Sequence, residues 1–129
     1  MDLRRLDHVG VIVEDLGAAK QLLTDLGLEL TETLETGDLT AAFFKCGDAS
    51  VELIEVHDEA QRLERLGEGN QARIEHIAFD VGDLAKALGA LGALGVEPNA
   101  PPRHLPDRSM IWTQPETSGG IMFQFVERH

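Results

Sequence analysis

The chain has 129 residues, of which 43% are hydrophobic and 26% are charged, and its formal net charge is −12. This length suits one globular domain with a buried core, and the negative charge argues against nucleic acid or an anionic membrane surface, since both attract clustered Lys and Arg. No run of about 18 apolar residues is present to span a bilayer, and no basic and then apolar leader opens the sequence. Cys46 is the single cysteine, so no disulfide can form within the chain, and we expect a cytoplasmic protein.

The first half of the chain predicts a strand, a helix and three further strands. Alternating apolar residues indicate the strands, while Asp15 stands where it would cap the helix and Gly27 where it would end it. A short loop containing Gly47 predicts a hairpin between the last two strands. The predicted elements are residues 8–13, 16–26, 28–34, 40–45 and 50–56.

The second half predicts the same order after a polar link. Residues 58–72 are polar and predict a helix that ends before Gly67. A strand beginning at Glu75, a helix over 83–94 and a short strand near Val96 follow. The stretch 98–106 is too rich in proline to pair inside a sheet, and strands over 109–113 and 121–126 close the chain. We therefore predict a single domain, 1–129, with one module at about 6–57, a link at about 58–73 and a second module at about 74–127.

An internal repeat relates the two halves. Residues 6–16 (LDHVGVIVEDL) match residues 74–84 (IEHIAFDVGDL), so His8 corresponds to His76 with a shift of 76 − 8 = 68. The last strand of each half also matches, and there Glu52 corresponds to Gln124 with a shift of 124 − 52 = 72. We place the four additional residues of the second copy in its proline-rich loop. The repeat predicts two related halves that converge on one site.

Two histidines, one carboxylate and one amide stand at these matched positions. Such a mixture of imidazole and oxygen ligands suits a borderline divalent ion: Zn, Co, Ni, Mn or Fe. Each residue has a simpler explanation, since a strand histidine is often a hydrogen-bonded core residue and a strand Glu or Gln often faces solvent. The repetition within apolar strands favours the metal site, whose predicted ligands are His8, Glu52, His76 and Gln124. The three histidines without a repeat partner, His57, His104 and His129, are expected at the surface.

Four segments carry a resemblance to the vicinal oxygen chelate superfamily, and within it to methylmalonyl-CoA epimerases. They are residues 6–11 (LDHVGV), 51–54 (VELI), 75–81 (EHIAFDV), and Pro115 with 119–125 (GGIMFQF). The resemblance implies an α+β fold in which two tandem βαβββ modules form an open, U-shaped mixed sheet around one divalent metal. It also implies a homodimer, because open sheets leave edges that need covering.

The implied activity is epimerisation of a 2-methyl-branched acyl-CoA thioester through a metal-stabilised enolate. The epimerases usually have Glu at the last-strand position, whereas this chain has Gln124, which can coordinate but cannot act as a general base. The ligand charge would then rest on Glu52, which becomes both a metal ligand and the catalytic proton-transfer residue. The family's second acidic residue aligns with Thr36, and its neighbour Glu35 would serve after a one-residue slip; the alternative is that Glu35 is an ordinary solvated loop carboxylate.

Substrate contacts and alternative functions follow from the same resemblance. Coenzyme A is polyanionic, so on this acidic chain it would need a local basic patch, for which Arg103, His104 and Arg108 are the candidates. A glyoxalase I-type lyase acting on a hemithioacetal would share the metal and the fold. A non-catalytic binding protein of the drug-resistance type and an iron-dependent dioxygenase stay open as well. The discriminating observation is metal content by elemental analysis, followed by proton exchange at the substrate α-carbon in deuterated buffer.

Overall fold

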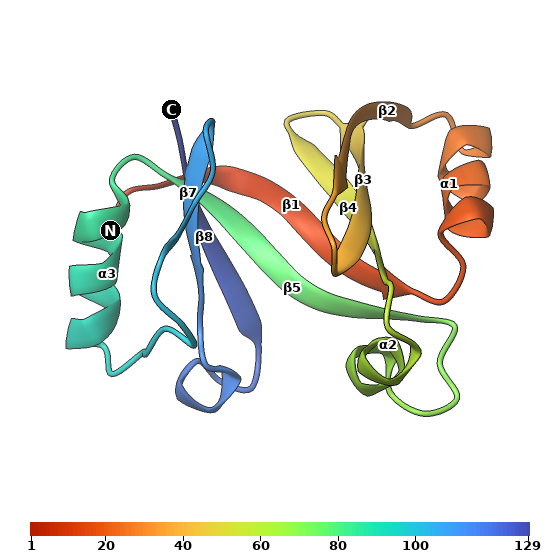
Figure 1. The fold of residues 1–129 in the computed structure, drawn as a ribbon. Helices are drawn as coiled ribbons and strands as arrows, with labels where there is room; N and C mark the ends of the chain where they lie inside the picture. The colour runs from red at the N-terminus through yellow and green to blue at the C-terminus, as the bar shows by residue number, and fades with distance from the viewer. The chain divides into compact units, whose positions relative to one another are not determined.

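The computed structural model describes all 129 residues and has an α+β fold (Figure 1). Its elements follow the predicted order of strand, helix and three strands, twice, with one helix between the halves. They are β1 (Leu3–Val13), α1 (Leu16–Asp25), β2 (Glu29–Glu35), β3 (Leu39–Cys46), β4 (Ala49–Val56), α2 (Glu59–Leu66), β5 (Ala72–Val81), α3 (Leu84–Ala93), β6 (Arg103–His104), β7 (Arg108–Trp112), the 3-10 helix η1 (Pro115–Thr117) and β8 (Met122–Arg128). The two tandem βαβββ modules are thereby confirmed.

The strands form one mixed sheet in the order β2-β3-β4-β1-β5-β8-β7-β6. In each module the first strand pairs with the last in parallel, β1 with β4 and β5 with β8, and the other pairs within each module are antiparallel. The registers of the parallel pairs repeat as well: Gly10 lies opposite Glu52, and Ala78 lies opposite Gln124. The duplication read from the sequence is thus kept at the level of single residue pairs.

The chain divides into two compact units whose boundaries fall inside the two longest strands. One unit contains Met1–Asp7 and His76–His129, and the other contains His8–Glu75. The predicted link therefore belongs, with α2, to the unit of His8–Glu75, and β1 and β5 each contribute residues to both units.

In the unit of His8–Glu75 the strands bury apolar side chains on both faces. Helix α1 covers one face, where the buried residues are Val13, Leu16, Ala42, Phe44 and Leu53. The other face packs against the end of α2 through Ile12, Ala41, Phe43, Ile54, Val56 and Leu66. Successive strand residues point to opposite faces, so His8, Gly10 and Ile12 share the second of these faces.

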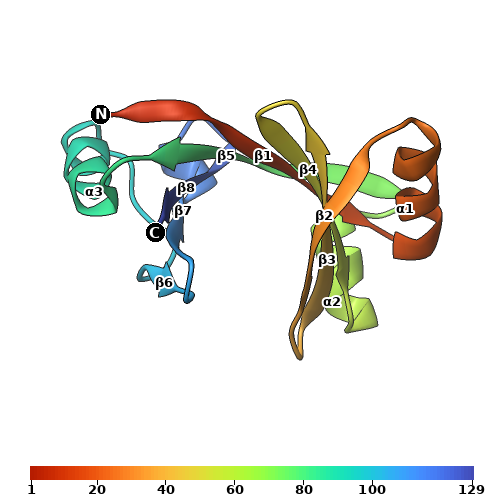
Figure 2. The same ribbon diagram turned by 90° about the horizontal axis from the view of Figure 1, so that it is seen from above.

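In the other unit α3 covers one face of the strands. Its buried cluster consists of Val81, Leu84, Ala87, Leu91, Ile111 and Phe125. The opposite face carries a smaller cluster of Ala78, Met110 and Val126, against which Leu105 and Trp112 pack. Figure 2 shows α1 and α3 each beside the strands of its own unit. His76 lies two residues before Ala78 on β5, and Gln124 lies two residues before Val126 on β8, so both share the face of the smaller cluster.

The three α-helices begin at aspartate caps. The side chain of Asp15 accepts a hydrogen bond from the Ala18 amide at 3.0 Å, and Asp83 does the same for Lys86 at 3.0 Å. Gly27 follows α1 with φ of 97°, a left-handed conformation that glycine adopts without strain. No helix of the structure is long and apolar enough to cross a membrane.

Two details of the second module differ from prediction. The short strand predicted near Val96 is reduced to an isolated antiparallel bridge between Pro98 and Thr113, and Val96 itself packs in the α3 cluster. The proline-rich stretch contributes only the short strand Arg103–His104 at the edge of the sheet, as expected for a segment that cannot pair centrally. Most of the four additional residues of the second module also lie outside the proline-rich loop, where we had placed them. Phe43 lies opposite Glu52 and Trp112 lies opposite Gln124, so Phe43 and Trp112 are equivalent positions in the two modules. The residue numbers of equivalent positions differ by 112 − 43 = 69 at β7 and by 124 − 52 = 72 at β8. Three of the four extra residues are therefore in the turn that contains η1, where the proline and two glycines form a longer connection than the β3–β4 hairpin.

Candidate metal centre

His8 and Glu52 form a buried pair on adjacent strands. Because Gly10 lies opposite Glu52 in the parallel β1–β4 register, the His8 side chain, two residues earlier, points to the same face as Glu52. The imidazole Nε2 of His8 is 3.2 Å from Oε1 of Glu52. His8 is 4% exposed and Glu52 is 8% exposed. The imidazole of His8 and the ring of Phe43 form a T-shaped contact with a centroid distance of 5.5 Å. A carboxylate this deeply buried needs a cation or strong hydrogen bonds to be stable.

His76 and Gln124 occupy the corresponding positions on β5 and β8. The parallel register places Gln124 opposite Ala78, two residues after His76, so both side chains share one face. Each is only 3% exposed. Gln124 donates a hydrogen bond from Nε2 to Sδ of Met110 at 3.2 Å, but its carbonyl oxygen Oε1 has no hydrogen-bond partner. A buried oxygen left without a partner costs about 1–3 kcal/mol, a cost that coordination to a cation would remove.

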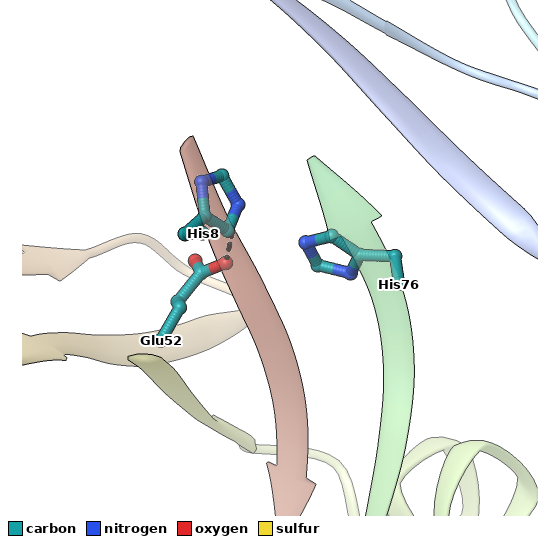
Figure 3. A group of neighbouring side chains, drawn as sticks. All are labelled: His8, Glu52 and His76. Atoms are coloured by element: carbon teal, nitrogen blue, oxygen red, sulfur yellow. Dashed lines mark ion pairs between the residues drawn. The ribbon is translucent and has the colours of Figure 1, made fainter. Parts of the chain in front are cut away.

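Three of the four predicted ligands form one group of neighbouring side chains (Figure 3). One ligand atom from each of His8, Glu52 and His76 lies within 4.8 Å of the others, and all three residues are buried. The two imidazoles and the carboxylate of this group are ligands of the kind that borderline divalent ions bind, and the buried amide oxygen of Gln124 has no hydrogen-bond partner. The residues present therefore fit a divalent metal.

A cation from α2 lies near Glu52. The guanidinium of Arg65 holds both carboxylate oxygens of Glu75, with two N–O distances of 2.8 Å. The hydrogen bond to Glu75 raises the pKa of Arg65 above its ordinary value, burial opposes this rise, and the negative charges of Glu75 and Glu52 add to it. Arg65 thus stays charged and contributes positive potential at Glu52.

Asp7, next to His8 in the chain, is held by two arginines. Arg128 donates to both carboxylate oxygens of Asp7 at 2.9 Å, and Arg5 donates to the same carboxylate at 3.0 Å. Arg5 also reaches Asp80 at 3.2 Å. These bonds satisfy the charge of a side chain that is only 2% exposed, and they fix β1 immediately before its histidine.

Glu35 is not part of the buried group. It is the last residue of β2, pairs with Thr40 and is exposed. The hydroxyl of Thr36, the residue that aligns with the family's second acidic position, accepts from the amide of Leu39 at 3.1 Å and so belongs to the β2–β3 turn. A role for Glu35 in proton transfer stays a prediction.

Glu32 is a carboxylate that the sequence interpretation did not single out. It lies opposite Phe43, which in turn lies opposite Glu52, and it is half-buried. A shift in register between Leu30 and Glu32 sets this alignment. Residues opposite one another in a sheet share a face, so Glu32 and Glu52 are on the same side of the sheet.

The predicted basic patch is not a surface feature as a whole. Arg103 and His104 are exposed in β6, but Arg108 is 6% exposed and lies 3.6 Å from the carboxylate of Asp107. The reason is its position on β7, where Arg108 shares the inward face of Met110. Arg103 and His104 therefore lie at the surface whereas Arg108 does not, and a coenzyme A contact through these residues stays a prediction.

The three histidines without a repeat partner are exposed, as predicted: His57, His104 and His129. Nδ1 of His57 donates to the Gly37 carbonyl at 3.1 Å, and its Nε2 is hydrogen-bonded to the Thr40 hydroxyl at 2.8 Å. These contacts give His57 an ordinary structural role at the surface.

Comparison with known proteins identifies the family. A family model described as the Glyoxalase/Bleomycin resistance protein/Dioxygenase superfamily matches residues 5–125. The chain belongs to this superfamily. The resemblance read from the four sequence segments is thereby confirmed, and the buried group of His8, Glu52 and His76 is a site at which this glyoxalase-superfamily protein has the residues to hold a metal ion.

Individual relatives agree with this assignment. "Uncharacterized protein YqjC" of Bacillus subtilis (strain 168) is 29% identical to this superfamily member, over 97% of this chain and 93% of its own length. The crystal structure of methylmalonyl-CoA epimerase from Mycobacterium tuberculosis superposes with a TM-score of 0.85 at 24% identity, covering 98% of this chain and 89% of that one. A methylmalonyl-CoA epimerase in complex with methylmalonyl-CoA and NH4+ gives 0.84 at 22% identity, covering 98% and 96%. At these identities the two structures show a shared fold.

Proposed function

We propose that this protein is a metal-dependent isomerase that epimerises a 2-methyl-branched acyl-CoA thioester. The observation that carries the proposal is the repeated pair of buried ligands, His8 with Glu52 and His76 with Gln124, in the same strand register. The substrate class is supported by the epimerase of the same fold that was solved with methylmalonyl-CoA.

In this proposal His8, Glu52, His76 and Gln124 hold one divalent ion. When bound, the ion would supply Lewis-acid stabilisation of the negative charge that develops on the thioester oxygen as the α-proton leaves. The histidines provide neutral nitrogen ligands, and Glu52 provides the one negative charge among the four. The apolar side chains that share a face with each histidine, Ile12 with His8 and Ala78 with His76, would limit access of water to the reacting carbon.

Glu52 is the proposed base. When the carboxylate removes the α-proton, the electron pair of the C–H bond moves toward the carbonyl oxygen. The product of this step is a planar enolate. Return of a proton to the opposite face of that plane inverts the carbon. Gln124 has no proton-accepting oxygen that titrates near neutral pH, so of the two matched last-strand positions only Glu52 can act in this step.

The proton returned to the other face requires a second acid. Glu35, the residue implied by the resemblance, is exposed at the end of β2, whereas Glu32 is half-buried on the face of Glu52. We propose that a carboxylate of β2 has this role, and the positions of the two side chains favour Glu32.

Exchange at the α-carbon tests the proposed function. Incubation of methylmalonyl-CoA with the protein and Co²⁺ in deuterated buffer should incorporate deuterium at C2, as followed by proton NMR. A chelator should stop the exchange. Failure of the metal-loaded protein to exchange deuterium into methylmalonyl-CoA would rule out this substrate.

One observation favours a second candidate, a metal-dependent small-molecule binding protein without catalysis. Gln124 replaces a carboxylate that the epimerases and glyoxalase I usually use for proton transfer, so the four ligands include only one carboxylate. A binder would retain metal but would exchange no α-proton of methylmalonyl-CoA, and it would not convert a hemithioacetal. A glyoxalase I-type lyase would act on the hemithioacetal alone.

A further inference from the structure

The amide of Gln124 has two ends of similar size and opposite chemistry. Oε1 accepts hydrogen bonds and can bind a cation, whereas Nε2 carries two protons and cannot. Rotation of the amide by 180° exchanges the two atoms with little change in shape. A glutamine that serves as a metal ligand therefore needs a neighbour that selects its orientation.

Met110 is placed to make this selection. In the antiparallel β7–β8 pair Trp112 lies opposite Gln124 and Met110 lies opposite Val126, so the Met110 and Gln124 side chains are diagonal neighbours on one face. Sδ of Met110 accepts the hydrogen bond from Nε2 of Gln124 at 3.2 Å. Both residues are buried, with exposures of 6% and 3%, in the cluster around Ala78 and Val126.

The reversed amide would be unfavourable at this place. Oε1 would then meet the lone pairs of the thioether sulfur, and an N–H group would take the position in which Oε1 now lies without a partner. A thioether offers an acceptor and no donor, so Met110 stabilises only the orientation in which Nε2 faces the sulfur and Oε1 faces away from it.

We propose that Met110 is a positioning residue of the metal site: its sulfur holds the Gln124 amide so that Oε1 is presented as a ligand. The inference rests on the proposed metal site and adds a requirement that is specific to glutamine. A glutamate at this position has no N–H group to donate a hydrogen bond to the sulfur. The orienting effect of Met110 therefore depends on an amide at residue 124.

A double-mutant cycle tests the proposal through metal affinity, without reference to turnover. Co²⁺ dissociation constants are measured by competition with a chromophoric chelator for the wild type, Met110→Leu, Gln124→Glu and the double variant. Leucine keeps the volume and apolar character of methionine, and such exchanges leave packing largely intact. Thermal unfolding of each metal-free variant checks that the fold is retained.

Met110→Leu alone should weaken Co²⁺ binding by about tenfold, the lower end of the effect of removing a group that orients a ligand. In the Gln124→Glu background the same exchange should leave the affinity unchanged. Equal affinity of Met110→Leu and the wild type would overturn the positioning role while leaving the metal site intact. An equal loss in both backgrounds would also overturn it, because the methionine would then act through packing. A wild type that binds no Co²⁺ would refute the metal site itself, and the inference with it.

Discussion

Glu52 and Gln124 occupy the same position in two copies of one strand pair, yet they differ in the property that matters for proton transfer. Each is buried opposite a small residue, Gly10 or Ala78, and two positions from a histidine. The carboxylate can both bind a cation and accept a proton, whereas the amide can only bind. The duplication therefore supplies matched ligands but a single candidate base.

Replacement of that base should separate binding from turnover. Glu52→Gln keeps an oxygen that can coordinate but removes the titrating group, so epimerisation should fall by about 10²–10⁴-fold while metal is still retained. Steady-state assays and elemental analysis of the same preparation check both expectations. Gln124→Glu is the matched variant in the other module and should keep or raise activity. Unchanged deuterium incorporation by Glu52→Gln would remove Glu52 from the proton path.

The two carboxylates of β2 can be compared in the same way. Glu32→Gln should lower turnover by about 10²-fold or more, since it removes a general acid from the face of Glu52. Glu35→Gln changes an exposed side chain three residues away, so its turnover should be close to that of the wild type. Turnover numbers for the two variants decide the matter, and a loss confined to Glu35→Gln would restore the role that the resemblance gives to Glu35.

At the scale of helices and strands, the sequence predicted the elements whose residues alternate clearly or whose helix ends carry Asp and Gly. The first five residues of β1 were missed because their polar side chains break the alternation, and the structure satisfies them through the ion pairs of Arg5, Asp7 and Arg128. The face of Glu32 was also missed. It depends on the register shift after Leu30, and a one-residue shift in a strand changes the face of every side chain that follows.

The ion pairs around Asp7 predict a stability effect. Asp7→Asn removes the charge that two arginines contact and should lower the free energy of unfolding by about 1.5–3 kcal/mol, the usual value for hydrogen bonds to charged groups. Urea denaturation measures the change. Asp2→Asn is the control, since Asp2 is 75% exposed in its pair with Arg4 and should change stability by less than about 0.5 kcal/mol. Equal stability of Asp7→Asn and the wild type would show that the buried pairs contribute nothing.

At the scale of the whole molecule, the repeat made the architecture and three members of the buried group predictable from one sequence. The histidines were identified because they recur in register, and Glu52 because it stands at the matching end of its strand. Met110 and Arg65 carried no such signal. Their contacts to Gln124 and Glu75 join segments whose spacing in the sequence follows no repeat, and only the folded chain brings them together.

The strand order also bears on assembly. The sheet ends in β2 on one side and β6 on the other, and edge strands leave backbone groups that natural proteins cover. We predict a homodimer, so sedimentation equilibrium should give twice the 14.1 kDa mass of the chain. A single species of 14.1 kDa at micromolar concentration would contradict this prediction.

The metal content of the purified protein is the decisive test of the four-residue site. After incubation with Co²⁺ and removal of free ion, elemental analysis should find about one equivalent per chain in the wild type, and the bound ion should raise the melting temperature, because it binds only the native state. His8→Ala and His76→Ala should retain no stoichiometric metal, while His57→Ala, which removes an exposed imidazole, should retain as much as the wild type. A wild type that holds no metal and whose melting temperature does not respond to Co, Ni, Zn or Mn would contradict the four-residue site.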